Sequence, residues 1–227
     1  MPDGANHVAF AYSVDGKDRF TTLYPNLNLL TDSKDFKNKN VADPFEPTSI
    51  TSPDSTIAKE GNDTYLHFLR TGSNSLDWFK AYMIRGGSAY KDFTNVDVKP
   101  NSHYTFSVWL KGTGEHTIIA YNNWTIPNPT TLTVKLNNTW TRYSLTVVTS
   151  ATIPTQEALF FIRSENVGTE INLKYPKVEE GSTATPWIPS FSEATAEDYP
   201  SYIGTYTDND SNTQSTSPER YSWKKIE

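Results

Sequence analysis

Two segments of the chain combine large aromatic rings with side chains that can bind hydroxyl groups. Residues 76–90 contain Asp77, Trp78, Phe79, Tyr82, Arg85 and Tyr90, and residues 121–128 contain Tyr121, Asn122, Asn123 and Trp124. An aromatic ring packs against the apolar C–H face of a pyranose with little loss of rotamer entropy, while amide, acid and guanidinium groups orient the sugar hydroxyls. This combination is typical of sites that bind sugars without acting on them.

Each of these rings has an alternative role, because most buried aromatic side chains serve packing. Trp124 is the best candidate for a ligand contact, since it lies among polar residues and prolines in an expected loop, where an indole has no obvious core partner. Trp109 is a further candidate, because it lies on the polar side of its expected strand, which faces either solvent or a binding surface. The residues that we predict to bind sugar are Tyr121, Asn122, Asn123, Trp124, Trp78, Tyr82, Arg85 and Trp109.

Residues that could catalyse a reaction or hold a metal ion are scattered along the chain. The histidines lack the close spacing of a zinc site, and there is no G-x-S-x-G motif. The carboxylate pair of a glycosidase is defined by its distance in space, so the sequence leaves that pair open. We expect a protein that is not an enzyme and has no cofactor.

Residues 208–219 are in part similar to a calcium-binding loop. Asp208, Asp210, Asn212 and Glu219 occupy its positions 1, 3, 5 and 12. Position 6 is Thr213, where the sharp turn of such a loop needs glycine, and no helices are expected on either side. We therefore favour a solvated loop, with a calcium site as the weaker alternative.

The composition excludes several classes of protein. The chain has 227 residues, enough for one or two domains, and a net charge of −6 without the basic patch of a nucleic-acid-binding protein. Its longest apolar run covers residues 158–162, far short of the ~20 residues that a membrane span needs, and no signal peptide is visible. The absence of cysteine excludes a disulfide framework.

Short strands separated by turns dominate the expected secondary structure. In residues 103–112 the apolar side chains of Tyr104, Phe106, Val108 and Leu110 alternate with more polar ones, which is typical of a half-buried strand. Residues 141–148 repeat the pattern, and further strands are expected at residues 65–70, 116–121, 131–136, 158–163 and 170–177. With no helical stretch of ten residues, this succession predicts an all-β antiparallel sandwich or barrel.

Both ends of the chain contain strand-like pieces but too few apolar residues for a core of their own. These pieces are residues 8–13, 202–208 and 220–226. Because an isolated two-stranded hairpin is marginal in water, we expect the ends to pair into one small β unit. The predicted organisation is a flanking unit of residues 1–25 and 199–227, a domain of residues 26–190 inserted into it, and a linker of residues 191–198.

Four pieces of the middle carry a family resemblance: residues 28–30 (NLL), 104–112 (YTFSVWLKG), 140–143 (WTRY) and 177–187 (KVEEGSTATPW). Together they resemble the jelly-roll carbohydrate-binding modules, akin to families 4 and 9, of bacteriophage tail fibres and baseplates. Residues 7–16, 202–208 and 221–223 resemble an element of tail proteins from siphophages that infect lactic acid bacteria. The resemblance implies a jelly-roll β-sandwich inserted into a small β unit formed by the two termini.

The same resemblance implies a function. It implies a receptor-binding or adhesion protein of the phage tail tip or baseplate, part of a longer tail protein, that acts at the bacterial surface. The expected partners are host cell-wall polysaccharide or oligosaccharide, other phage tail proteins and further copies of the chain, with neither nucleic acid nor membrane. Trp140 and Trp187 fall on recurring structural positions of the family. The resemblance also allows for a structural calcium ion.

The alternative is a structural spacer of the baseplate that binds protein neighbours only. Exposed rings at Trp124 and Trp78 would favour sugar binding, and burial of both would favour the spacer.

Overall fold

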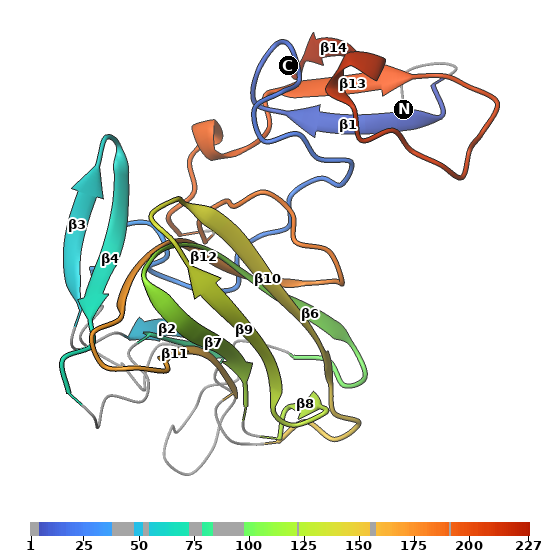
Figure 1. Ribbon diagram of the computed structural model, residues 1–227. Helices are drawn as coiled ribbons and strands as arrows, with labels where there is room; N and C mark the ends of the chain where they lie inside the picture. The colour runs from blue at the N-terminus through green and yellow to red at the C-terminus, as the bar shows by residue number, and fades with distance from the viewer. Residues whose placement is uncertain are drawn as a thin grey trace. The chain divides into compact units, whose positions relative to one another are not determined.

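The computed structural model describes residues 5–37, 48–51, 55–72, 79–83, 98–121, 123–154, 158–190 and 192–227. The chain forms two compact units, shown in Figure 1. One consists of Asn28–Ala184 and Pro189–Glu193, and the other of Met1–Leu27, Thr185–Ile188 and Ala194–Glu227. The region expected as a linker, residues 191–198, is divided between the two units after residue 193.

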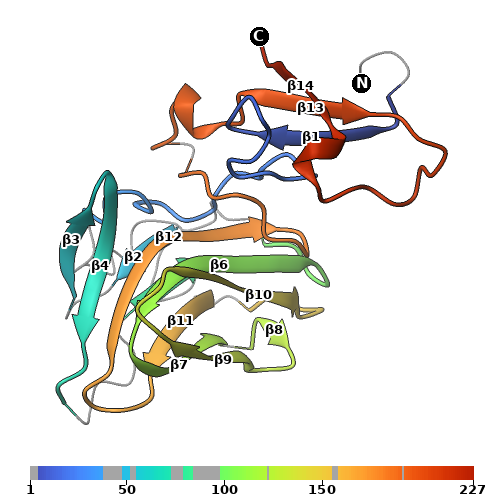
Figure 2. The ribbon, with the colours of Figure 1, turned by 45° about the horizontal axis from the view of Figure 1, so that its top comes forward.

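The larger unit is a sandwich of two antiparallel sheets. In spatial order, the six-stranded sheet contains β3 (Thr56–Glu60), β4 (Asp63–Leu69), β12 (Glu170–Glu180), β6 (His103–Gly112), β10 (Thr141–Thr149) and β8 (Thr125–Ile126). The five-stranded sheet contains β2 (Thr48–Thr51), β5 (Phe79–Met83), β11 (Ala158–Ser164), β7 (Gly114–Ala120) and β9 (Thr130–Leu136). Figure 2 shows the two sheets as layers, with β12, β6 and β10 in one and β11, β7 and β9 in the other. The predicted all-β sandwich is confirmed.

The core lies between the sheets and follows the alternation seen in the sequence. Every second side chain of β6 is buried in it. Phe106 of β6 stacks on Phe79 and Phe160 of the opposite sheet, with ring centroids 6.3 and 5.4 Å apart. Because strand side chains alternate between faces, the residues between these core positions lie on the outward face of each sheet.

A buried ion pair lies in β12, on either side of the core residue Val178. Lys177 Nζ lies 3.3 Å from Glu179 Oε2, and neither side chain has exposed surface. Burial disfavours the charged ammonium and lowers the pKa of Lys177 to about 8, although the neighbouring Glu179 carboxylate opposes the shift. The pair therefore carries a desolvation cost that depends on pH.

The smaller unit is a three-stranded antiparallel sheet built from both ends of the chain. Its order is β1 (His7–Ala11), β13 (Tyr202–Tyr206) and β14 (Ser222–Lys225), and both termini lie at this unit in Figure 1. His7 pairs with Tyr206 and Ala11 with Tyr202, so residues far apart in sequence share one ladder. The predicted small β unit formed by the two termini is confirmed. Two single-turn 3-10 helices, Ala196–Asp198 and Pro218–Arg220, belong to this unit. No helix in the described ranges is long and apolar enough to cross a membrane.

Trp223 supplies much of the apolar contact in the smaller unit. It lies opposite Gly204 in the ladder, and a Cβ on Gly204 would approach its ring to 2.8 Å. A Cβ on Gly16, whose φ is +74°, would approach the same ring to 2.1 Å. The indole N–H donates to the Pro218 carbonyl at 3.0 Å. Two glycines thus let the backbone approach closely one large ring, which also contacts the rings of Phe20 and Tyr221.

Replacing Gly16 tests this close approach. Gly16→Ala combines a left-handed residue with a clash against Trp223, and we expect it to lower the free energy of unfolding by about 2–5 kcal/mol. Gly61→Ala is the matched control, since Gly61 has a φ of +61° and no atom within 4 Å of the added Cβ; only the conformational cost, ~1–2 kcal/mol, is expected there. Urea titration with circular dichroism measures both values. Equal losses in the two variants would contradict the packing role.

The buried lysine predicts a pH dependence of stability. Above pH 8 folded Lys177 releases its proton, while in the unfolded chain it stays protonated up to its ordinary pKa of 10.5. The unfolded state then binds more protons, so this group makes stability rise with pH, by at most about 1.4 kcal/mol per pH unit between pH 8 and 10.5. The double variant Lys177→Met/Glu179→Gln should lack this component in urea titrations over the same range. Parallel profiles for both proteins would show that the prediction is wrong.

Candidate functional site

Tyr121 places an exposed ring beside the outward face of the five-stranded sheet. It follows β7 directly and its side chain is 47% exposed. Its ring meets that of Phe161 in β11 edge to face, with centroids 6.1 Å apart and planes at 83°. In the described part of the chain its hydroxyl has no hydrogen-bond partner. The phenol therefore presents both an apolar surface and a free polar group to solvent.

Polar side chains continue the same face along β11. Arg163 follows Phe161 by two residues and lies opposite Thr117 of β7. Its Nε and one terminal nitrogen donate to Glu165 Oε1, both at 3.4 Å, and the Thr117 hydroxyl donates to the same oxygen. The Arg163 side chain is 40% exposed and that of Glu165 is 24% exposed. The ion pair holds the guanidinium in place while leaving both groups accessible.

Together these residues form one line on the sheet, which we call the Tyr121 row: Tyr121, Phe161, Arg163, Glu165 and Thr117. From residue 161 to residue 165 it spans roughly 13 Å of strand. One end is aromatic, and the other offers guanidinium donors and a carboxylate acceptor. This is the set of groups that a sugar ring and its hydroxyls require.

Asn123 serves the loop that follows Tyr121. Its φ of +60° is left-handed, a conformation that asparagine adopts more readily than most residues. Asn128 donates from Nδ2 to Asn123 Oδ1 at 2.6 Å and accepts the Asn123 backbone N–H at 3.2 Å. The two amides therefore cross-link the loop, and the predicted sugar contact of Asn123 stays a prediction.

Trp124 lies in the core, so the expectation of an exposed indole is wrong. Its side chain is only 2% exposed and belongs to the core between the sheets. The physical reason is the path of the loop. It returns along β10, where Ser150 donates its backbone N–H to the Trp124 carbonyl at 2.8 Å and Ile126 pairs with Val148. The indole N–H is buried and has no hydrogen-bond partner in the described part of the chain.

The remaining predicted sugar-binding residues do not all gather at the Tyr121 row. Trp109 lies in β6, opposite Arg142 and Lys174, on the outward face of the other sheet. The backbone of Tyr82 lies in β5, opposite Leu159 of β11. The others lie outside the described residues: Asn122, Trp78 and Arg85.

The Tyr121 row also contains residues that sequence reasoning missed. Phe161 and Arg163 fall inside an expected strand whose letters, ALFFIRS, begin as an unbroken apolar run. Period-2 counting from the buried residues Phe160 and Ile162 would have placed Phe161 and Arg163 on the outward face.

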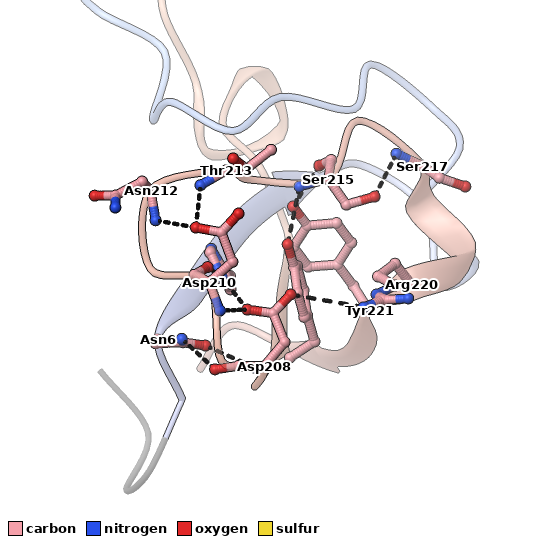
Figure 3. Close-up of polar contacts among 11 residues, drawn as sticks. Asn6, Asp208, Asp210, Asn212, Thr213, Ser215, Ser217, Arg220 and Tyr221 are labelled. Atoms are coloured by element: carbon pink, nitrogen blue, oxygen red, sulfur yellow. Dashed lines mark hydrogen bonds and ion pairs between the residues drawn. The ribbon is translucent and has the colours of Figure 1, made fainter.

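In the acidic loop of the smaller unit, each carboxylate accepts hydrogen bonds from its own local partners (Figure 3). Asp208 Oδ1 lies 2.9 Å from His7 Nε2 and accepts the Asp210 backbone N–H at 3.0 Å. Asp210 accepts the backbone N–H groups of Asn212 and Thr213, while Glu219 accepts the Ser217 hydroxyl. Within the ranges that the structure describes, no group of three or more His, Cys, Asp or Glu residues is placed to hold a metal ion.

These hydrogen bonds make the loop a set of local turns. The structure therefore does not support the alternative of a calcium site at Asp208, Asp210, Asn212 and Glu219. The hydrogen bond from His7 and that from the Asp210 backbone lower the pKa of Asp208 below its usual value. The structural calcium ion that the resemblance allows elsewhere stays a prediction.

Over its whole length the chain is similar to a chain of the tripod (BppUct-A-L) from the baseplate of bacteriophage Tuc2009. The two are 29% identical with a TM-score of 0.65, and the match covers 100% of this chain and 80% of that chain. The predicted resemblance to a phage baseplate protein is confirmed.

Two other solved structures are similar to parts of the chain. One is the enzymatically active domain of tailspike protein 4 from bacteriophage CBA120, at 14% identity and a TM-score of 0.45, covering 68% of this chain and 22% of that chain. The other is the carbohydrate-binding module CBM4, at 14% identity and a TM-score of 0.43, covering 69% of this chain and 100% of that chain. No protein-family model and no curated protein matches the chain.

The burial of Trp124 predicts a structural effect of its removal. Trp124→Ala should lower the free energy of unfolding by about 3–5 kcal/mol, since it leaves a cavity in the core. Trp124→Phe should cost much less, because it keeps an aromatic ring and removes a buried N–H without a partner, which itself costs about 1–3 kcal/mol. Urea titration measures both. Full stability of the alanine variant would contradict the core position.

Proposed function

We propose that the chain binds a saccharide of the host cell wall, without acting on it chemically, as part of the tail tip or baseplate of a phage that infects lactic acid bacteria. The observation that carries the proposal is the Tyr121 row, in which an exposed phenol lies in line with Arg163 and Glu165. The full-length similarity to a chain of a phage baseplate tripod supports the proposed location on the virion.

In this proposal the Tyr121 ring stacks on the apolar face of a sugar unit. The Arg163 guanidinium then donates to hydroxyls, and the Glu165 carboxylate accepts from them. Each site is weak by itself, and several copies on one virion raise the overall affinity by ~10²–10⁴ without new contacts. The net charge of −6 fits a neutral or zwitterionic glycan better than a strongly anionic one, because like charges slow encounter.

A structural spacer with protein partners only is the second candidate. The burial of Trp124 favours it, since that ring was expected to face the ligand. The exposed ring of Tyr121 favours sugar binding instead. The two candidates differ in one measurable respect: only the saccharide-binding protein retains purified cell-wall polysaccharide when no other tail protein is present.

Tyr121→Ala tests the proposed site. Loss of one stacking ring should weaken binding to purified cell-wall polysaccharide by about tenfold or more, which corresponds to about 1.4 kcal/mol. Tyr121→Phe keeps the ring and should retain most of the affinity. Isothermal titration calorimetry measures the dissociation constants.

Leu69→Ala is the matched control, because Leu69 is 49% exposed but lies at the end of β4 in the other sheet. Unchanged affinity in both Tyr121→Ala and Arg163→Ala would remove the Tyr121 row from the site. A wild-type protein that retains no wall polysaccharide would favour the spacer.

A further inference from the structure

The outward face of the six-stranded sheet carries a second group of aromatic and charged side chains. Trp140 precedes β10, and the Nζ atoms of Lys111 in β6 and Lys174 in β12 lie 4.9 and 4.4 Å from its ring centroid. Tyr65 of β4 meets the ring edge to face at 5.7 Å. These residues, together with Glu60 and Asp63, form what we call the Trp140 cluster. Its indole is half-buried and so retains exposed surface.

Ion pairs and hydrogen bonds fix the orientation of this indole. Its N–H donates to Glu60 Oε2 at 2.7 Å, and Lys111 Nζ donates to the same oxygen at 3.1 Å. Lys174 donates to Asp63, which also accepts the Tyr175 hydroxyl. The ring is therefore held by groups from β3, β6 and β12 before any ligand arrives. Such preorganisation reduces the entropy lost on binding.

The backbone of β12 departs from regular strand geometry beside this cluster. The ladder to β6 shifts register between Lys174 and Lys177, and Tyr175 has a φ of +55°. A left-handed conformation is uncommon for an aromatic residue, and backbone strain of this kind concentrates at ligand-binding sites. The bulge directs the Tyr175 hydroxyl to Asp63, the carboxylate that holds Lys174.

Several polar groups around the indole remain open. Within the described ranges, Glu60 Oε1, the Tyr65 hydroxyl and the indole N–H of Trp109 have no hydrogen-bond partner. Trp109 lies directly opposite Lys174 in the ladder, and the Glu60 side chain is 54% exposed. The half-buried ring thus lies beside an acceptor and a hydroxyl, and Trp109 offers a donor on the same face of the sheet. Sugar hydroxyls can use all three.

The charges of the cluster balance, which indicates the class of ligand. Two ammonium groups, Lys111 and Lys174, are paired with the two carboxylates of Glu60 and Asp63. An anionic or cationic ligand would find no net opposite charge among these four groups, and the neighbouring Arg142, opposite Trp109, is half-buried and donates to the Ser107 hydroxyl. An uncharged ligand that offers one apolar face and several hydroxyls fits the arrangement best.

We propose that the Trp140 cluster is a second saccharide-binding site, specific for neutral sugar units. It goes beyond the function proposed for the Tyr121 row, because it uses the other sheet and none of the same residues. The outward faces of a sandwich point in opposite directions. One chain with both sites binds two glycan strands at once and joins them.

The competing explanation is that the cluster only ties the β3–β4 hairpin to the rest of the sheet. In that case its variants change stability without changing affinity. The Tyr121→Ala variant is the right background for a test, because any saccharide that it still binds occupies a different site.

The probe is the neutral oligosaccharide fraction released from cell walls of lactic acid bacteria, titrated into ¹⁵N-labelled protein. In Tyr121→Ala, the indole N–H signals of Trp140 and Trp109 should shift and saturate, while that of the buried Trp124 should stay unchanged. Trp140→Phe assigns the signal by its loss. Adding Trp140→Ala to the Tyr121→Ala background should weaken the remaining binding at least tenfold.

Glu60→Gln is the milder second variant, since it keeps the size of residue 60 but removes the charge and replaces one acceptor oxygen by an amide donor. We expect a several-fold weaker affinity in the same background. Leu69→Ala again controls for an exposed apolar residue. Urea midpoints of all variants separate folding from binding.

The outcomes distinguish this proposal from that for the Tyr121 row. If Tyr121→Ala abolishes all binding and Trp140→Ala binds like the wild type, the second site is overturned and the first stands. If Trp140→Ala abolishes binding while Tyr121→Ala does not, the second site stands alone. If the wild-type protein binds none of the fraction, both proposals fail.

Discussion

The strict alternation of strand side chains between two faces is the constraint on which the rest of this structure depends. In the sandwich, Phe106 of one sheet stacks on Phe79 and Phe160 of the other, and these rings belong to the buried core that lies on the inward face of the strands. Once the core fixes the inward face of a strand, the residues between the core positions must lie on its outward face. The sequence of a core strand therefore encodes an outer surface as well. Both candidate binding surfaces lie on the outward faces of the two sheets, whose inward faces pack in the core.

The regular strands of the sandwich could be predicted because local pattern and tertiary burial agree in them. Residues 103–112 form β6 with the expected bounds, since each apolar residue of the alternating set finds the core. β11 was expected at nearly the observed bounds, but its outward residues were hidden by a run of apolar letters. There the burial of Phe160 and Ile162 is needed to show that Phe161 faces outward.

Trp124 shows why the candidate site was harder to predict than the fold. Its neighbours in sequence are polar residues and prolines, which is typical of a solvated loop. Its surroundings are set by long-range bonds to Ser150 and Val148, which bring the loop back onto β10 and its indole into the core. No local pattern contains that information. Trp109 was placed on the correct face of its strand, but only the sheet order shows that it lies on the other sheet from Tyr121.

The smaller unit was predicted because neither end of the chain has enough apolar residues to form a core by itself. What the sequence could not show is how the unit packs: Trp223 lies against Gly16 and Gly204 and contacts the rings of Phe20 and Tyr221. This contact needs glycine at two positions that are remote in sequence. Their role becomes visible only when the ladder of β13 and β14 places Gly204 opposite Trp223.

The pairing of β1 with β13 has a mechanical consequence. Residues of the sandwich lie in a loop of chain that this ladder closes, since His7 is bonded in register with Tyr206. Tension applied before β1 and after β14 is carried by the hydrogen bonds between the strands of the three-stranded sheet. Because the sandwich is inserted between β1 and β13, tension reaches it only after this ladder has broken.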